Sequence, residues 1–294
     1  MTRRSFNATC HRNRRRVRGS AIAVLLVAVL APGMSAGGQR VPSAPRIPSA
    51  AEFKRADVQA RQRILRAWAH GVPETAGIGL LPLLDAGLRD ADRDVRLYAV
   101  GVVHRVANEA NRARVTGRPV VTDPGAYPSV YRTLLALLDH PDPIFRGGVV
   151  GALSAFDVAP RDGLDRAILT RFATEVPSVR ARMVTALAES ATRGSGKARA
   201  VVLATLDDSD PRVKESAIKT MRDLRDPGAL PVLLREASAA TEPWIRKTAV
   251  QVVRAYGESA KAYGSVLREA LTRETDPGVR AELERTVEKL APNR

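Results

Sequence analysis

One short block of residues returns six times along the chain, and it limits the possible folds more than any other feature. Its clearest copy lies within DSDPRVKESAIKTM, residues 208–221. The copies begin at spacings of 50, 34, 34, 32 and 34 residues, with Asp92, Asp142, Val176, Asp210, Glu242 and Asp276. Repeats of this length are typical of solenoids, in which each unit buries its apolar face only against its neighbours.

Each block has the features of a helix start. An acidic residue at the N-cap can accept a hydrogen bond from a free backbone N–H, and proline at the first helical position has no N–H to leave unpaired. Apolar residues then recur at steps of 4, 8 and usually 11 from an anchor, which places them on one helical face. The anchors are Val95, Phe145, Val179, Val213, Ile245 and Val279.

A second amphipathic stretch precedes most blocks, as in residues 130–138, 198–206, 228–237 and 263–271. Each unit is therefore expected to be a pair of helices joined by a tight turn. We predict an all-α fold, an α-solenoid of about six helix pairs over residues 51–294. A degenerate helix at 52–69 is expected to cap one end, and the polar last helix the other.

The blocks, with their pattern D-P-x-V-R-x-x-A and paired helices, resemble HEAT repeats, in particular the short HEAT-like type also found in phycobilisome lyases. The resemblance covers roughly residues 80 to 290. It implies a scaffold or binding surface, because most such families are scaffolds and only a few are enzymes.

A basic residue follows each anchor directly. On a helical wheel it lies about 100° from the anchor, between apolar neighbours. A charge in that position needs a partner, either the acid of its own block or that of the next block. We predict a structural ladder between repeats, formed by Arg96, Arg146, Arg180, Lys214, Arg246 and Arg280.

The free face of the block helices changes character along the chain. In the earlier blocks it carries small residues, and in the later blocks it is basic. If this face is concave, as the HEAT resemblance implies, its basic end is a candidate partner-binding groove, with the tryptophan as an aromatic anchor. An ordinary solvated face is the alternative. The candidate residues, called the basic face below, are Lys219, Arg222, Trp244, Lys247, Gln251 and Arg254.

The first 36 residues have the pattern of an export signal. Seven arginines and no acid precede an apolar run at 21–31, and small residues follow it. We predict a signal peptide over 1–36, a flexible linker over 37–50 and an exported protein, periplasmic or extracellular. Arg3-Arg4 also resembles a twin-arginine signal, and an uncleaved membrane anchor is the alternative.

Cleavage would change both charge and redox chemistry. The full chain has a net charge of +16, and loss of the leader would leave 40 basic residues against 31 acidic ones, or +9. It would also remove Cys10, the only cysteine, so the mature chain would form no disulfide.

No enzyme signature is present in the sequence. The histidines, including His104 and His140, lack metal-ligand spacing, and RGSGKAR at 193–199 lacks the first glycine and the Ser or Thr of a phosphate loop. We therefore predict a non-catalytic protein that needs no cofactor or metal. The long spacing after the first block predicts an inserted surface loop near 108–128, which could also carry function.

Two classes of function fit these features. The first is an exported, monomeric scaffold that binds another protein. The second is a polyanion or nucleic-acid binder of the DNA-repair type, which the positive charge allows but the scarcity of stacking aromatics does not favour. A lyase-like role rests on the family resemblance alone.

Overall fold

The computed structural model describes residues 47–70, 79–120, 122–156 and 162–291. All elements below lie in these ranges and belong to the unit that spans residues 44–294. The predicted leader and most of the linker lie outside the described residues. Within the described ranges the chain forms α-helices and short 3-10 helices and no strands, as the sequence predicts.

The α-helices form seven consecutive pairs. They are α1 (Ala50–Arg55) with α2 (Val58–His70), α3 (Leu80–Leu88) with α4 (Arg93–Thr116), α5 (Pro128–Ala136) with α6 (Pro143–Ser154), α7 (Asp162–Arg171) with α8 (Pro177–Thr192), α9 (Gly196–Ala204) with α10 (Pro211–Leu224), α11 (Leu230–Ala239) with α12 (Pro243–Ala255), and α13 (Gly264–Arg273) with α14 (Pro277–Leu290). Short 3-10 helices occupy many of the turns: η1 (Pro124–Ala126), η2 (Leu137–Asp139), η3 (Phe172–Thr174), η4 (Thr205–Asp207), η5 (Pro227–Ala229) and η6 (Gly257–Tyr263).

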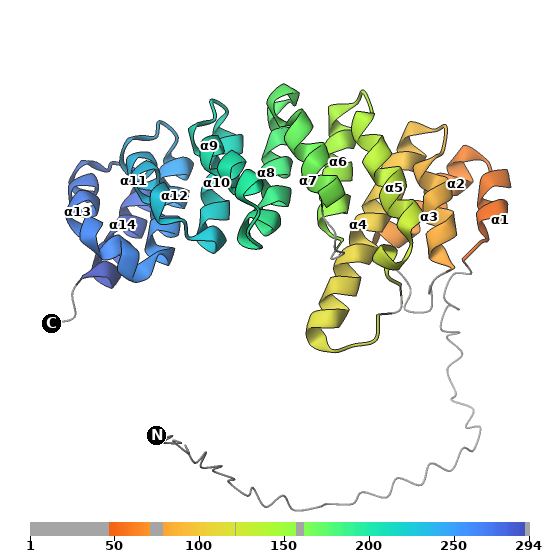
Figure 1. Ribbon diagram of the computed structural model, residues 1–294, viewed down its shortest axis with the longest axis horizontal. Helices are drawn as coiled ribbons and strands as arrows, with labels where there is room; N and C mark the ends of the chain where they lie inside the picture. Colours follow the sequence, from red (N-terminus) through yellow and green to blue (C-terminus); the bar gives the residue numbers. More distant parts are fainter. Residues whose placement is uncertain (1–46, 71–78, 121, 157–161, 292–294) are drawn as a thin grey trace, which may run out of the picture. The chain divides into compact units, whose positions relative to one another are not determined.

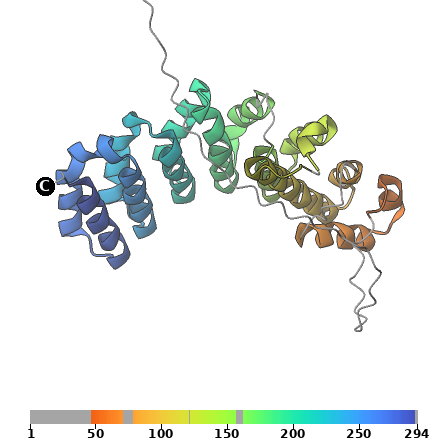
Figure 2. The same cartoon turned by 90° about the horizontal axis from the view of Figure 1, so that it is seen from below.

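The pairs stack into two layers of helices. The second helices of successive pairs pack on one another from α2 to α14 and form one layer, while most of the first helices contact their counterparts in the other layer. Figures 1 and 2 show the pairs side by side along the unit, in sequence order. The six predicted blocks form the last six members of the second layer, α4 to α14. The predicted solenoid is therefore confirmed.

The helix starts follow the predicted chemistry. Asp92, Asp142, Asp210 and Asp276 each accept a backbone N–H of the first turn with their side chain. All six anchors are buried, and so are the apolar residues one and two turns after them, except Val287, which is partly buried. Ser190, the polar exception in the pattern, is buried too, and its hydroxyl donates to Asp165 of α7 at 2.7 Å. The seam between the two layers is thus one continuous apolar core.

The N-terminal end differs from the single capping helix predicted at 52–69. The helix ends at Arg55, and a second one begins at Val58, because Asp57 accepts the N–H of Ala60 and starts a new turn. Ser49 caps α1 through a reciprocal bond with Glu52, and Ile47 packs on the core. The described part of the predicted linker therefore belongs to the fold.

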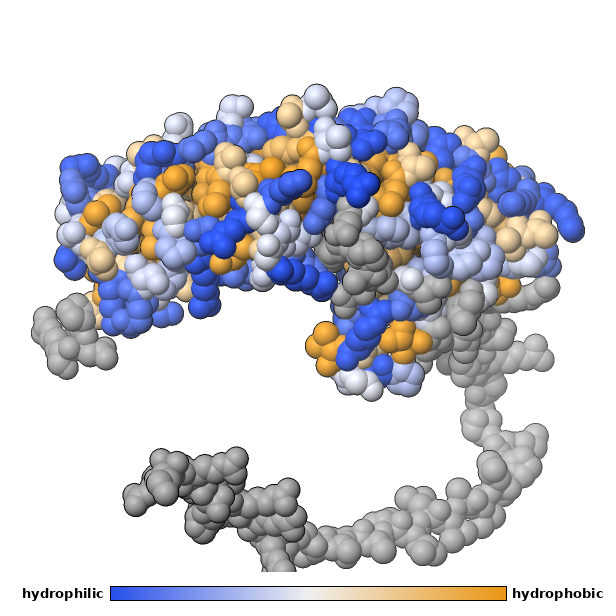
Figure 3. All heavy atoms as spheres, in the orientation of Figure 1, coloured by the Kyte–Doolittle hydropathy of each residue, from blue (hydrophilic) through white to orange (hydrophobic). Residues whose placement is uncertain are grey.

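The predicted insertion loop at 108–128 is in large part helical. Helix α4 continues to Thr116, and Ala110 and Ala113 of this extension are buried. Gly117 then ends the helix in the left-handed conformation, with φ of 68°. Figure 1 shows the end of α4 projecting beyond the neighbouring helices. Val115 lies on this segment with an exposed fraction of 88%, and Figure 3 shows apolar surface there.

Candidate functional site

The recurring arginines tie each repeat to the next. The guanidinium of Arg180 donates through Nε and Nη2 to both carboxylate oxygens of Asp208, at 3.1 and 2.9 Å. Arg146 reaches Glu175 in the same way at 2.8 and 2.7 Å, and Arg246 reaches Glu274 at 2.7 and 2.8 Å. Such two-bond contacts between planar groups are the strongest geometry available to an ion pair. We call each of these contacts a rung.

Each arginine also holds its own turn. Nη1 of Arg246 donates to the carbonyl oxygens of Ala240 and Thr241, which directly precede its own helix. Arg146 and Arg180 make the same kind of bond to the turn before theirs. One guanidinium thus fixes the turn of one repeat and the acid of the next, which a single ammonium group cannot do equally well.

The rung acid comes from the next unit, one or two residues before its N-cap, and not from the arginine's own block. Asp208 also accepts the N–H of Asp210, and Glu274 accepts the N–H groups of Thr275 and Asp276. The carboxylate is therefore shared between two repeats. Through its bond with Arg246, the pKa of Glu274 lies below its ordinary value.

Sequence reasoning missed the first rung. Arg61 in α2 contacts Asp90 through Nε at 2.8 Å, and Asp90 accepts the N–H of Asp92 at 2.9 Å. The signal was present, since Asp57 and Arg61 have the same spacing as Asp92 and Arg96. Alanine replaces the larger anchor there, which hid the block.

The rung of Arg96 ends on a histidine. Nη2 of Arg96 lies 3.2 Å from Nε2 of His140, whose Nδ1 accepts the N–H of Asp142 at 3.1 Å. A neutral imidazole has only one acceptor nitrogen, so it cannot accept both bonds. Burial and the charge of Arg96 lower the pKa of His140, and Nε of Arg96 is buried without a hydrogen-bond partner among the described residues. This rung is weaker than its neighbours.

The rung of Lys214 is open. The residue at the acid position of the next unit is Ala240, and α12 has no side-chain cap. Nζ of Lys214 turns instead to Glu236 of α11, at 3.2 Å. Arg280, on the last helix of the described residues, pairs with Glu284 on its own helix. The predicted ladder position therefore holds complete rungs at Arg146, Arg180 and Arg246, and other contacts at the remaining three.

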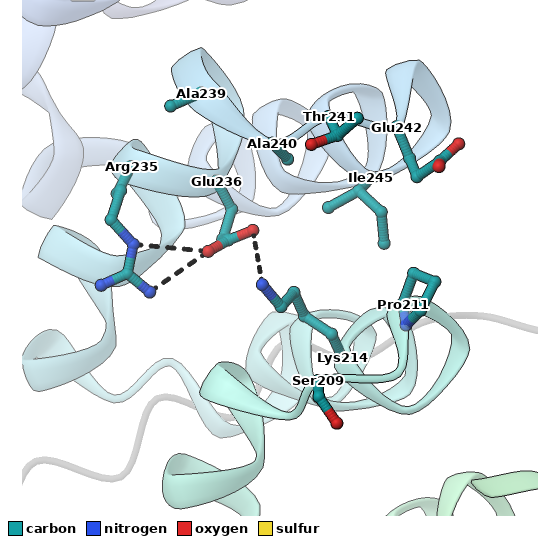
Figure 4. A pocket seen from close by; sticks show the side chains of 10 residues that line it. All are labelled: Ser209, Pro211, Lys214, Arg235, Glu236, Ala239, Ala240, Thr241, Glu242 and Ile245. Atoms are coloured by element: carbon teal, nitrogen blue, oxygen red, sulfur yellow. Dashed lines mark hydrogen bonds and ion pairs between the residues drawn. The ribbon is translucent and has the colours of Figure 1, made fainter.

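A cleft of about 460 Å³ lies at the open rung. Figure 4 shows Lys214 reaching across it to Glu236, which also receives Arg235, while Pro211 and Ile245 form an apolar wall. The remaining lining residues are Ser209, Ala239, Ala240, Thr241 and Glu242. The cleft exists where a shorter base and an alanine replace the groups that close the complete rungs.

The basic face is partly occupied by acids of the same chain. Lys219 pairs with Glu215 at 2.7 Å. Arg254 pairs with Glu282 of α14, and Gln251 donates to the same carboxylate at 3.3 Å. Burial alone would raise the pKa of Glu282, but bonds from Arg285 and Gln251 and the charge of Arg254 outweigh it and lower that pKa.

The other members of the basic face are exposed. Arg222 on α10 and Lys247 on α12 are open to solvent, and Trp244 is 37% exposed at the start of α12. Helices α10 and α12 pack against each other, so the structure brings these residues onto neighbouring helices of one layer. They form the part of the basic face that a partner can reach.

The described residues show neither a metal site nor a membrane span. No group of three or more potential metal ligands occurs among them. None of the helices in these ranges is both long enough and apolar enough to cross a membrane.

The two layers and the ladder define an α-solenoid of helix-pair repeats. Residues 164–254 match the family model for HEAT repeats. This part of the chain is thus similar to HEAT repeats.

Solved structures share the fold at low sequence identity. Kap121p is 15% identical, with a TM-score of 0.53, over 81% of this chain and 26% of that chain. Two designed armadillo repeat proteins, one in complex with the peptide (KR)4, are 16% and 17% identical, each with a TM-score of 0.41 over 82% of this chain and 98% of the design. No curated protein matches the sequence.

Proposed function

We propose that this α-solenoid protein is an exported, non-catalytic scaffold that binds another protein through the second-helix layer near α10 and α12. Stacked helix pairs present a long preformed surface, which is the usual binding surface of solenoid proteins. The observation that carries the proposal is Trp244, an exposed indole one helical turn before the accessible cation Lys247 on α12, with the exposed Arg222 on the neighbouring helix α10. Tryptophan and arginine are enriched among the few residues that carry most of the binding energy at protein interfaces.

The export part of the proposal rests on the leader pattern in residues 1–36. Its test is fractionation of cells that express the full chain, followed by N-terminal sequencing of the product. A mature N-terminus near residue 37 outside the cytoplasm supports export. An intact leader in the cytoplasmic fraction contradicts it.

The binding part is tested by crosslinking pull-down from envelope extract. The described core lies between residues 53 and 290, so residues 37–294 contain every element that it needs and serve as bait. The variant reverses the accessible part of the basic face, Arg222→Glu with Lys247→Glu and Trp244→Ala. The matched control reverses Arg132 of α5 and Arg273 of α13, which are also exposed but lie on first helices, away from α10 and α12.

A protein captured by the wild type and by the control, but lost with the variant, supports the scaffold. Equal capture by variant and wild type contradicts this placement of the interface. A polyanion alone, released as salt rises, would instead indicate the nucleic-acid class, because phosphate contacts weaken steeply with salt.

A further inference from the structure

The cleft at the open rung has the shape and polar groups of a site from which a carboxylate is missing. In the rungs of Arg180 and Arg246, and in the first rung at Arg61, a carboxylate does two things at once. It accepts the arginine of the preceding repeat, and it accepts a backbone N–H at the start of the next second helix. Asp90, Asp208 and Glu274 show both contacts within this one chain.

The same position in the unit of α12 holds only a methyl group. Ala240 offers Lys214 no acceptor, and the N–H of Glu242 stands where the N–H groups of Asp92, Asp210 and Asp276 each meet a carboxylate. The space that an acid would fill is part of the open cleft. The N–H of Glu242 therefore has no acceptor from position 240, and Lys214 contacts the carboxylate of Glu236 in the preceding helix instead.

The charges around the cleft nearly balance. Lys214 and Arg235 face Glu236, and Arg246 lies behind the turn, bonded to the carbonyls of Ala240 and Thr241. Glu236 is buried and shared between two bases, so its charge is compensated. Glu242, exposed at the mouth, is the one acid that would repel an incoming anion.

We infer that the open rung is an anchor site for an acidic side chain of the protein partner. An aspartate or glutamate carboxylate enters the cleft and accepts from Nζ of Lys214 and the N–H of Glu242, and so completes the ladder. Pro211 and Ile245 contact the methylene groups that carry it. This inference rests on the proposed scaffold function, because the acid comes from a bound protein.

The probe is the tetrapeptide acetyl-Glu-Thr-Asp-Pro-amide, which copies the rung acid and turn of residues 274–277. It is titrated into isotope-labelled residues 37–294 while backbone amide resonances are followed by NMR. Saturable shifts are expected at Glu242 and Thr241. The amides of Asp210 and Asp276 serve as internal controls, because their acceptors Asp208 and Glu274 are already in place.

Three protein variants and one control peptide make the test specific. The double variant Lys214→Arg with Ala240→Asp fills the rung with the protein's own groups, and the affinity for the peptide should fall at least tenfold. Lys214→Gln removes the cation without filling the cleft and should also weaken binding. Glu242→Gln removes the repelling charge and should strengthen it. A peptide with glutamine and asparagine in place of its acids should not bind.

The inference is wrong if the peptide leaves Glu242 unshifted in the wild type, or if the filled-rung variant or the amide peptide binds equally well. The pull-down separates it from the proposed function. Capture of the same partner by the wild type and by the filled-rung variant contradicts the anchor site and leaves the scaffold standing. Capture of no protein by the wild type contradicts the scaffold, and the peptide titration then decides the cleft by itself.

Discussion

Removal of one rung arginine should lower stability far more than removal of the lysine at the open rung. Arg246→Ala deletes the two bonds to Glu274 and the two bonds to its own turn. Loss of one partner from a buried ion pair costs about 3–5 kcal/mol. The side chains of Arg246 and Glu274 are 14% and 5% exposed, and Glu274 keeps two backbone donors. We therefore expect the low end, about 3 kcal/mol.

The matched control is Lys214→Ala. It removes a single bond at 3.2 Å from a side chain that is 23% exposed, and Glu236 keeps Arg235. Its expected cost is about 1 kcal/mol, the usual net value of one hydrogen bond. For a domain of this size, 1 kcal/mol corresponds to roughly 2–4 °C in Tm. Arg246→Ala should thus lower Tm by about 6–12 °C, and Lys214→Ala by about 2–4 °C.

Urea unfolding followed by circular dichroism measures both variants. Trp68 in α2 and Trp244 in α12 add local signals from the two ends, with Trp68→Phe and Trp244→Phe backgrounds to separate them. The Trp244 signal should change at lower urea in Arg246→Ala. Equal losses of unfolding free energy in Arg246→Ala and Lys214→Ala would refute the ladder argument, because the two sites would then be equivalent.

Three further predictions concern the weak rung at His140 and the buried acid Glu274. His140→Asp gives Arg96 a carboxylate like those of Asp90 and Asp208 and should raise the free energy of unfolding by about 1 kcal/mol, with Tm higher by roughly 2–4 °C in a thermal melt. The wild type should also lose stability as pH falls below 6.5, the ordinary pKa of histidine, because the folded state holds His140 at a lower pKa and binds fewer protons there than the unfolded chain. The variant should lose less stability over the same pH range, because it keeps only the contribution of His104, whose pKa burial also lowers. The pKa of Glu274 is likewise lowered, so its contribution is complete above the ordinary value of 4.5 and is lost as pH falls through the folded-state pKa. Urea unfolding at a series of pH values measures this effect. The free energy of unfolding of Arg246→Ala should fall less than that of the wild type as the pH is lowered.

The fold was predictable because its determinants are local. The caps at Asp142 and Asp210, the anchors Phe145 and Val213, and the apolar steps after them each act within one helix, so a single repeat shows them all. The projecting end of α4 was missed because its buried positions are alanines, which give no strong apolar pattern. Helix propensity and Gly117 carry the signal there instead.

Only the basic residues of the ladder could be predicted from the sequence, and their acidic partners could not. A guanidinium between apolar neighbours requires a partner, and that requirement can be inferred from one helix. The partner itself lies 28 or 29 residues further on, in the turn before the next block, as for Arg146 with Glu175 and Arg180 with Asp208. The repeated block begins only after that turn, so the acid lies outside the block. The cleft at Ala240 follows from the absence of an acid in one copy, which becomes visible only when the rungs are compared.

The shared carboxylates affect where the repeat array bends or unfolds locally first. Each rung acid starts the helix of its own unit and holds the arginine of the unit before, so order in one repeat supports order in the next and the units resist separation together. Between α10 and α12 this linkage is a single lysine contact to another helix. That joint is where the array should flex or open first, and where hydrogen exchange should divide the protein into an N-terminal and a C-terminal cooperative segment. A partner that supplies the missing acid would link α10 to α12 and make their contact more rigid.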